Sequence, residues 1–179
     1  MLDTQTSCLV VIDLQGKLAN LMQERESLFK ATATLVQSAQ QLNVPILWCQ
    51  QCPDALGPTI EPLRALLAGE TPINKSSFSC WANEHFRQRL AQINRQQVVL
   101  CGIETHICVW QTAMNLLGQQ FEVEVVADAV SSRTAANKRL GLDRMRRAGM
   151  GITSLEMVLF EWLKDADHPN FDQIAKLIK

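Results

Sequence analysis

Three side chains in this sequence could carry out nucleophilic chemistry if the fold brings them together. Cys108 supplies a thiol, Asp13 a carboxylate and Lys75 an ammonium group. A thiolate attacks carbonyl carbons, a carboxylate takes the thiol proton or orients a water, and an ammonium group holds two anions close together. These residue types therefore predict covalent attack by Cys108 on a small carbonyl compound.

The expected position of Cys108 favours a reactive thiol. Cys108 falls in the first turn of an expected helix, just after Thr105. Unpaired amides and the helix dipole at such a position, helped by a cation such as Lys75, lower a thiol pKa from about 8.5 to roughly 3.5–7.5. The alternative is that Cys108 is a small buried residue, that Asp13 caps a loop and that Lys75 is solvated.

Cys49 and Cys52 form a C-x-x-C spacing, which raises the possibilities of a redox pair or a zinc site. A zinc site needs a second pair of ligands, and none occurs at zinc spacing. A thioredoxin-like pair begins a helix, whereas Pro53 argues against a helix here. Two unrelated loop cysteines are the simpler interpretation.

The histidines give no metal site. His106 is two residues from Cys108, so it lies on a different helix face and is expected at the surface or at an interface. His85 and His168 have no acidic or cysteine companions at ligand spacing. We therefore expect no metal.

Loop-like segments near these residues could form the wall of a substrate pocket. The pocket residues that we predict are Trp48, Gln50, Phe78 and Trp81. The alternative for the aromatic residues is that they belong to the core, as most aromatic residues do.

The elements that must position these residues alternate between strands and helices. Apolar runs typical of buried strands occupy residues 8–12, 44–48, 98–101, 121–126 and 152–155. Helical patterns occupy 24–42, 61–67, 83–93, 104–117, 134–148, 156–163 and 171–178. This order predicts an α/β fold with helices on both faces of a parallel sheet.

Ligands in such folds bind outside the carboxyl ends of the strands. Asp13 follows the first expected strand, Cys108 follows the third, and Asp128 follows the fourth. Asp13 and Cys108 would therefore share one edge if their strands are neighbours. Residues 50–62 hold prolines and a glycine and are expected to form a loop, and Gly118 is expected to end its helix in the left-handed conformation.

The composition favours one globular domain covering residues 1–179, with a formal net charge of -1. The basic residues are scattered, so we expect no nucleic-acid partner. The first apolar run has only five residues, too few for a secretory signal or a membrane span, so we expect a cytoplasmic protein. The six cysteines are then expected to be thiols.

Four segments, taken in order, resemble the isochorismatase-like cysteine hydrolase superfamily. They are Val11 to Gln15, Lys75 to Ser79, Cys101 to Cys108, and Val126 to Ala129. Within the superfamily the chain is most similar to the isochorismatase domain-containing group. The segments that carry this closer similarity are Gln50 to Pro53, Leu56 to Thr59, Ser131 to Arg133, Arg144 to Arg146, and the end of the chain from Asp167.

The resemblance implies a doubly wound, three-layer αβα fold whose mostly parallel sheet has six strands. It implies a catalytic triad of Asp13, Lys75 and Cys108, and a cis peptide bond between Ile103 and Glu104. It also implies that the backbone amides of Glu104 and Cys108 form an oxyanion hole. The implied reaction is attack by the thiolate, loss of an amine protonated by Asp13, and hydrolysis of the thioester.

The sequence departs from some members of the superfamily. Relatives that hydrolyse nicotinamide bind a metal through an Asp-x-His pair, but residues 50–54 contain no histidine. True isochorismatases cleave a vinyl ether and lack the cysteine. We therefore expect a cofactor-independent hydrolase of an amide or N-carbamoyl C–N bond that forms a homo-oligomer, as is typical of the family. The alternative is a binding or scaffold protein that has lost turnover.

Overall fold

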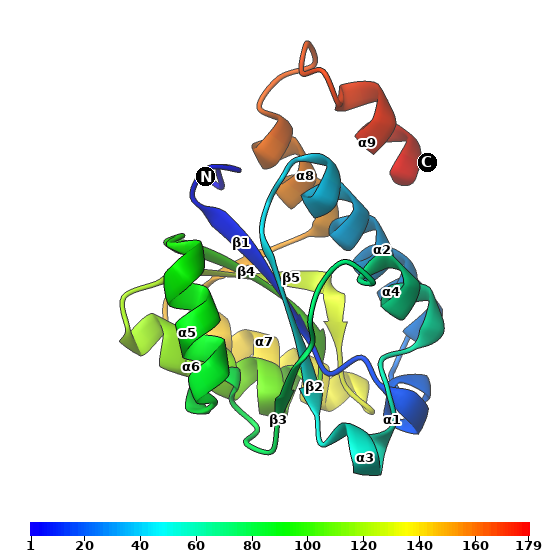
Figure 1. The fold of residues 1–179 in the computed structure, drawn as a ribbon, viewed down its shortest axis with the longest axis vertical. Coiled ribbons are helices and arrows are strands. Elements are labelled where there is room, and N and C mark those ends of the chain that lie inside the picture. The colour runs from blue at the N-terminus through cyan, green and yellow to red at the C-terminus, as the bar shows by residue number, and fades with distance from the viewer.

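The computed structural model describes all residues 1–179, and a six-stranded parallel sheet forms its centre (Figure 1). The strands lie in the order β3-β2-β1-β4-β5-β6. Their bounds are β1 Ser7–Ile12, β2 Ile46–Gln51, β3 Ile73–Lys75, β4 Gln97–Ile103, β5 Glu122–Ser131 and β6 Gly151–Thr153. The predicted doubly wound α/β fold is thereby confirmed.

Helices cover both faces of the sheet. Packed on one face are α1 (Gly16–Asn20), α2 (Arg25–Gln41), α4 (Glu61–Leu66), α8 (Leu155–Leu163) and α9 (Phe171–Leu177) (Figure 1). Packed on the other are α5 (Glu84–Ile93), α6 (Trp110–Gly118) and α7 (Ala135–Arg147). Shorter elements are α3 (Pro53–Leu56), a 3₁₀ turn at Cys80–Ala82 and a π-helical turn at Thr105–Val109.

Strand β1 shows why its sequence is apolar at every position. Leu9 and Val11 belong to the hydrophobic core under α2 and α8, whereas Val10 and Ile12 belong to the core under α5 and α6. A strand that is covered on both faces has no solvent side on which to place polar residues. The continuous apolar run therefore follows from the central position of β1.

The chain reverses its direction of travel across the sheet between β3 and β4. It builds β2 and β3 outward from β1, then returns to lay β4 on the other side of β1, with Ile12 opposite Gly102. The point where strand order reverses leaves a crevice at the carboxyl ends of the two central strands. β1 and β4 are thus neighbours, the condition for Asp13 and Cys108 to share one edge.

Two boundaries near this edge differ from the sequence-based expectation. Residues 50–62 were expected to be a loop, but β2 continues to Gln51 and the short helix α3 begins at Pro53. Proline is tolerated in a first helical turn because its missing N–H has no partner there in any case. The sequence patterns located five strands and missed β3, which has only three residues, too few to show a period.

Two further expectations were wrong. β5 does not end before Asp128 but continues to Ser131, and the exposed Asp128 instead accepts a hydrogen bond of 2.8 Å from the backbone N–H of Leu155 at the start of α8. Gly118 does not adopt the left-handed conformation; the residue that does is Gln120, with a φ of 65°. The additional residues of β5 pair with the carboxyl end of β4, where Val130 lies opposite Gly102 and Ser131 opposite Ile103.

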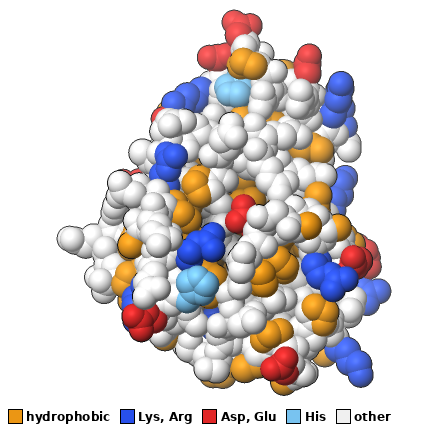
Figure 2. Space-filling model, in the orientation of Figure 1, with side chains coloured by type: hydrophobic (Ala, Val, Ile, Leu, Met, Phe, Trp, Pro, Cys, Tyr) orange, Lys and Arg blue, Asp and Glu red, His pale blue; other side chains and the backbone are white.

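No helix in the structure combines the length and apolar character needed to cross a membrane. Figure 2 shows acidic and basic side chains scattered over one face in small groups, with hydrophobic side chains between them. That face carries no continuous basic area.

Candidate active site

Asp13 and Lys75 form a buried ion pair at the carboxyl edge of the sheet. Asp13 follows β1 directly and Lys75 is the last residue of β3, so strands on either side of β2 bring them together. The Lys75 Nζ lies 2.6 Å from the Asp13 Oδ2, and the two side chains are 0% and 3% exposed. Asp13 has a φ of 54°, in the left-handed region that aspartate tolerates better than most residues.

The ammonium group of Lys75 is surrounded by oxygen atoms. Besides Asp13, its Nζ donates to the side chain of Gln51 at 2.7 Å and to the carbonyl oxygens of Phe78 at 3.2 Å and Ser77 at 3.3 Å. Burial, the largest single effect, lowers the pKa of Lys75, but the charge and hydrogen bond of Asp13 together with the nearby thiols of Cys80 and Cys108 raise that pKa overall. The group is therefore a fixed cation with no donor left for a substrate.

Gln51 and Gln15 support this cation, and the sequence reading did not identify either residue. Gln51 Oε1 accepts from Lys75, while its Nε2 donates to the carbonyl of Ser76 at 2.7 Å. Gln15 Oε1 in turn accepts from the backbone N–H of Gln51 at 2.6 Å. Gln51 also faces Lys75 across the β2–β3 pair, a register that only the pairing of strands reveals.

Cys108 lies in the π-helical turn that follows β4. Its side chain is buried, with 8% exposure, and it lines the same cavity as Asp13. Burial raises the pKa of the Cys108 thiol, and the negative charge of Asp13 raises it further, against a smaller opposing effect of Lys75. The expectation of a lowered thiol pKa is therefore wrong, because desolvation and a neighbouring anion both disfavour the thiolate.

The carboxylate of Asp13 has one oxygen free for this thiol. Burial raises the pKa of Asp13 and the charge of Lys75 opposes that rise. Oδ2 is occupied by Lys75, whereas Oδ1 is buried and has no hydrogen-bond partner. An unpaired acceptor on a residue that shares a cavity with a protonated thiol is suited to receive its proton.

Glu104 joins β4 to the turn that carries Cys108. The peptide bond between Ile103 and Glu104 is cis. The buried carboxylate of Glu104 accepts from the backbone N–H of Arg133 at 2.9 Å and from its Nε at 3.2 Å. His106 bonds elsewhere, with its Nδ1 3.0 Å from the hydroxyl of Ser132.

These groups surround a cavity of about 130 Å³. Its lining comes from the segments after β1, β2 and β4 and from the loop after β3. The lining residues are Asp13, Leu18, Gln51, Leu56, Phe78, Ile103, Glu104, Ile107 and Cys108. Of the four pocket residues predicted from the sequence, Phe78 is among them.

The other three predicted pocket residues lie elsewhere. Trp48 is buried in the core under α2 and donates from its Nε1 to Thr59 Oγ1 at 2.8 Å. Successive strand residues point to opposite faces of the sheet. Gln51 is directed at Lys75, so Gln50 points to the other face, where its Oε1 accepts a hydrogen bond from Thr59. Trp81 packs against the second core, where its ring meets that of Phe121 edge to face.

The cysteines of the C-x-x-C spacing point in different directions. Cys49 is buried in the second core, where its thiol interacts with that of Cys80. Cys52 is half-buried, and its Sγ lies 3.7 Å from the carbonyl oxygen of Lys75. All six cysteines are free thiols in the structure.

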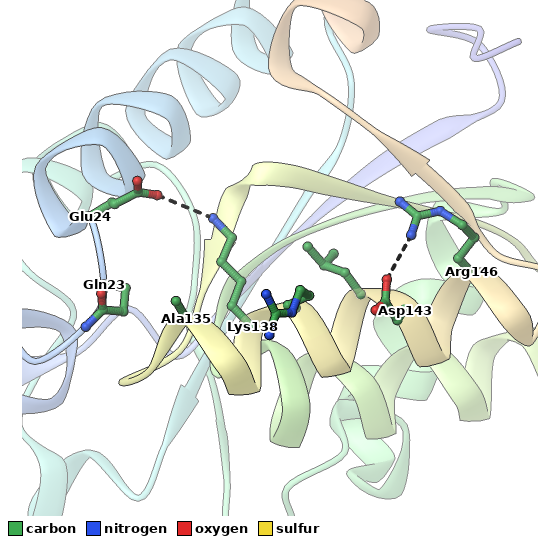
Figure 3. A pocket seen from close by; sticks show the side chains of 8 residues that line it. Gln23, Glu24, Ala135, Lys138, Asp143 and Arg146 are labelled. Carbon is green, nitrogen blue, oxygen red and sulfur yellow. Dashed lines mark hydrogen bonds and ion pairs between the residues drawn. The ribbon is translucent and has the colours of Figure 1, made fainter.

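A larger pocket of about 340 Å³ lies beside α7, away from these residues (Figure 3). Four of its five charged side chains form ion pairs: Lys138 with Glu24 at 3.9 Å, and Arg146 with Asp143 at 3.1 Å, whereas Arg139 is in none. It contains no nucleophile. No group of three or more His, Cys, Asp or Glu side chains in the structure could hold a metal ion.

Known proteins resemble this chain over most of its length. A family model described as the isochorismatase domain matches residues 7–157. The chain is 37% identical to isochorismatase domain-containing protein 2 of Danio rerio, covering 99% of this chain and 89% of that one. It is 38% identical to the secreted isochorismatase effector Isc1 of Phytophthora sojae, covering 97% and 85%.

Solved structures match over the same length. The MAR1 ribonuclease structure from Caenorhabditis elegans has a TM-score of 0.93 at 34% identity, covering 99% of this chain and 91% of that one. The structure of the YcaC gene product from Escherichia coli, titled an octameric hydrolase of unknown specificity, also has a TM-score of 0.93. The match covers 99% of this chain and 88% of that one, and at 23% identity it shows a shared fold. Because the domain model spans most of the chain and relatives above 30% identity align along nearly their whole length, this chain belongs to the isochorismatase family of hydrolases.

Proposed function

We propose that this chain is a cofactor-independent cysteine hydrolase that cleaves an amide or N-carbamoyl C–N bond through a thioester on Cys108. The observation that carries the proposal is the position of Asp13. Its Oδ2 is held by Lys75 at 2.6 Å, its Oδ1 is buried without a partner, and it shares one small cavity with Cys108.

In the first half of the proposed reaction, Cys108 forms a bond to the substrate. The thiol gives its proton to Asp13 Oδ1 as the sulfur attacks the carbonyl carbon. The carbonyl oxygen becomes an oxyanion that the backbone amides of Glu104 and Cys108 stabilise. Asp13 then passes the proton to the departing nitrogen, the C–N bond breaks, and an amine leaves a thioester behind.

In the second half, water cleaves the thioester. Asp13 takes one proton from the water as the water oxygen attacks the acyl carbon. The carbon–sulfur bond then breaks and releases a carboxylic acid. The same proton returns to the sulfur of Cys108. Asp13 thus acts as base and then acid in each half of the reaction, and it ends each turnover ionised.

Lys75 has an electrostatic role in this proposal. All its hydrogen-bond contacts are to protein oxygens, so it gives no proton to the substrate. A fixed positive charge beside Asp13 favours the carboxylate form at the start of each cycle.

The setting that fits this chemistry is a reducing compartment. A cytoplasmic location would keep the nucleophile and the other five thiols reduced, in line with the absence of disulfides from the structure. We also propose that residues 1–179 act as one domain, that the partner is a small molecule with no nucleic acid or membrane required, and that the chain forms a homo-oligomer.

The direct test is mass spectrometry of the intact chain, quenched seconds after mixing with a panel of small amides and esters. We expect an acyl adduct on Cys108 that is absent in Cys108→Ala and present in the matched variant Cys52→Ala. If no compound modifies Cys108 and none is hydrolysed, the alternative of a binding or scaffold protein is favoured.

Because the solved relative from Caenorhabditis elegans is titled a ribonuclease, the same assay includes an RNA oligonucleotide. We expect the RNA to remain intact. RNA cleavage that Cys108→Ala abolishes would replace the amide in this proposal.

A further inference from the structure

The size of the cavity limits what can reach Cys108. The volume of about 130 Å³ is well below the roughly 300–1,000 Å³ of ordinary ligand pockets. A cavity of about 150 Å³ lined by Leu, Ile and Phe is known to hold benzene. The space beside Cys108 therefore fits a molecule of about six non-hydrogen atoms.

The walls of the cavity are mostly apolar. Five of the side chains that line it carry no polar atom: Leu18, Leu56, Phe78, Ile103 and Ile107. A polar group buried against such walls without a hydrogen bond costs roughly 2–7 kcal/mol. An aliphatic group fits there without that cost.

The charges around the cavity oppose an anionic ligand. Besides the thiol of Cys108, the ionisable groups that line it are the carboxylates of Asp13 and Glu104. The nearby cations are already paired: Lys75 with Asp13, and Arg133 with Glu104. A carboxylate entering the cavity would lose its water and meet Asp13 and Glu104, and neither Lys75 nor Arg133 lines the cavity to compensate its charge.

We infer that the substrate is a small uncharged acyl compound with a short aliphatic group, and that the site rejects molecules carrying a carboxylate. This inference rests on the proposed function, because it concerns the same site. It narrows that proposal: a simple aliphatic amide fits, whereas an N-carbamoyl amino acid does not.

The test compares two alkylating reagents of equal size, iodoacetamide and iodoacetate. Both transfer a two-carbon group to sulfur and release iodide, but only iodoacetate is charged. We expect the ratio of the iodoacetamide rate to the iodoacetate rate to be at least tenfold larger at Cys108 than for N-acetylcysteine, measured by peptide mass spectrometry. A ratio equal to that of the free thiol, or below it, would overturn the inference.

A variant at the mouth of the cavity sharpens the test. Phe78 is 55% exposed, so its side chain can be replaced without disturbing the core. Phe78→Lys brings a free cation to the cavity and is expected to accelerate iodoacetate selectively, whereas the uncharged control Phe78→Met keeps the wild-type preference. If Phe78→Lys also keeps that preference, charge does not control access and the inference fails.

Turnover provides the second arm. Butyramide and oxamate have the same number of non-hydrogen atoms, and only butyramide is expected to acylate Cys108. If the chain hydrolyses neither compound, the proposed function is contradicted. Alkylation needs no turnover, so the alkylation ratio still tests whether the site rejects a negative charge. Faster acylation by oxamate than by butyramide would contradict the inference alone.

Discussion

Cys108 and Asp13 exchange one proton in the proposed reaction, and burial determines which of them holds it at rest. Burial and the charge of Asp13 raise the pKa of the thiol, so at neutral pH the sulfur keeps its proton. Lys75, paired with Asp13 at 2.6 Å, favours the ionised carboxylate. The thiolate is then formed only as the substrate is attacked.

This arrangement makes Asp13→Asn informative. We expect the variant to lose about 10²–10⁴-fold in kcat/KM, because no base remains to take the proton. The pKa of Cys108 should fall in the same variant, because a neighbouring negative charge has been removed. The pH dependence of Cys108 alkylation, measured beside the thermal melting of both proteins, checks this expectation; a midpoint that stays the same or rises would contradict it.

The wild-type enzyme should show a matching pH profile. Protonation of Asp13 removes the base, so kcat/KM should rise with pH through the pKa of that carboxyl group. Burial raises this pKa, which puts the rise above the ordinary value of about 3.9 for an aspartate. Steady-state rates across an acidic pH series check it, and a profile that is already flat below pH 4 would show that Asp13 is not the base.

Gln51 and Gln50 make a matched pair because they are adjacent in β2 and point to opposite faces. Gln51→Leu removes the 2.7 Å acceptor of Lys75 and leaves only the longer contacts to Ser77 and Phe78 beside Asp13. A hydrogen bond to a charged group is worth about 1.5–3 kcal/mol, so we expect roughly a 10- to 100-fold loss in kcat. Gln50→Leu breaks only bonds to Thr59 and Asn74 and should stay within about threefold of wild type. Rates with the same amide check both variants, and equal losses would show that Gln51 has no special role.

The same pair shows a limit of sequence reading at this scale. Asp13 and Cys108 could be selected by their chemistry and their places after expected strands, and Lys75 by its charge and the family resemblance. Which of two neighbouring glutamines faces the site depends on strand register, and a shift of one residue reverses the faces. Gln50 was therefore predicted for a position that Gln51 occupies.

At the scale of elements, the site depends on how closely β4 approaches β1. Gly102 has a φ of 115°, and a Cβ atom at this position would lie 2.0 Å from the carbonyl oxygen of Ile12. Ile12 precedes Asp13, so any displacement there moves the proposed base. At position 102, therefore, only glycine allows this close approach of β4 to β1.

Gly102→Ala should therefore destabilise the protein by at least about 1–3 kcal/mol, the usual cost of a strained backbone, and should lower activity as well. Gly118→Ala is the matched control, because Gly118 ends α6 with open space around it and alanine favours a helix by about 0.5–1 kcal/mol. Urea unfolding of both variants checks the difference. Similar midpoints for the two would contradict the account of close strand approach.

The sequence predicted most elements because their patterns are long. Five strands and seven of the helices could be located from apolar runs and helical periods. The short β3 and the π-helical turn around Cys108 could not, since three to five residues are too few to show a period. Only the family resemblance predicted that the sheet has six strands rather than five.

At the scale of the whole molecule, the exposed hydrophobic residues point to association. Met157 and Phe160 of α8 are exposed, and with Met1 they line a shallow pocket that nothing in the chain covers. We expect a homo-oligomer whose mass by light scattering is a multiple of the chain mass. A monomer mass at all concentrations would contradict this expectation.

The strand order has a consequence for how the protein is made. A nascent chain that has reached residue 96 already contains Asp13 and Lys75, the two charges of the ion pair, but it lacks β4, which covers the far side of β1. Until β4 is synthesised, β1 remains an apolar edge open to pairing with other chains. The step that closes this edge also delivers Cys108, so an incomplete polypeptide carries the aggregation hazard without the nucleophile.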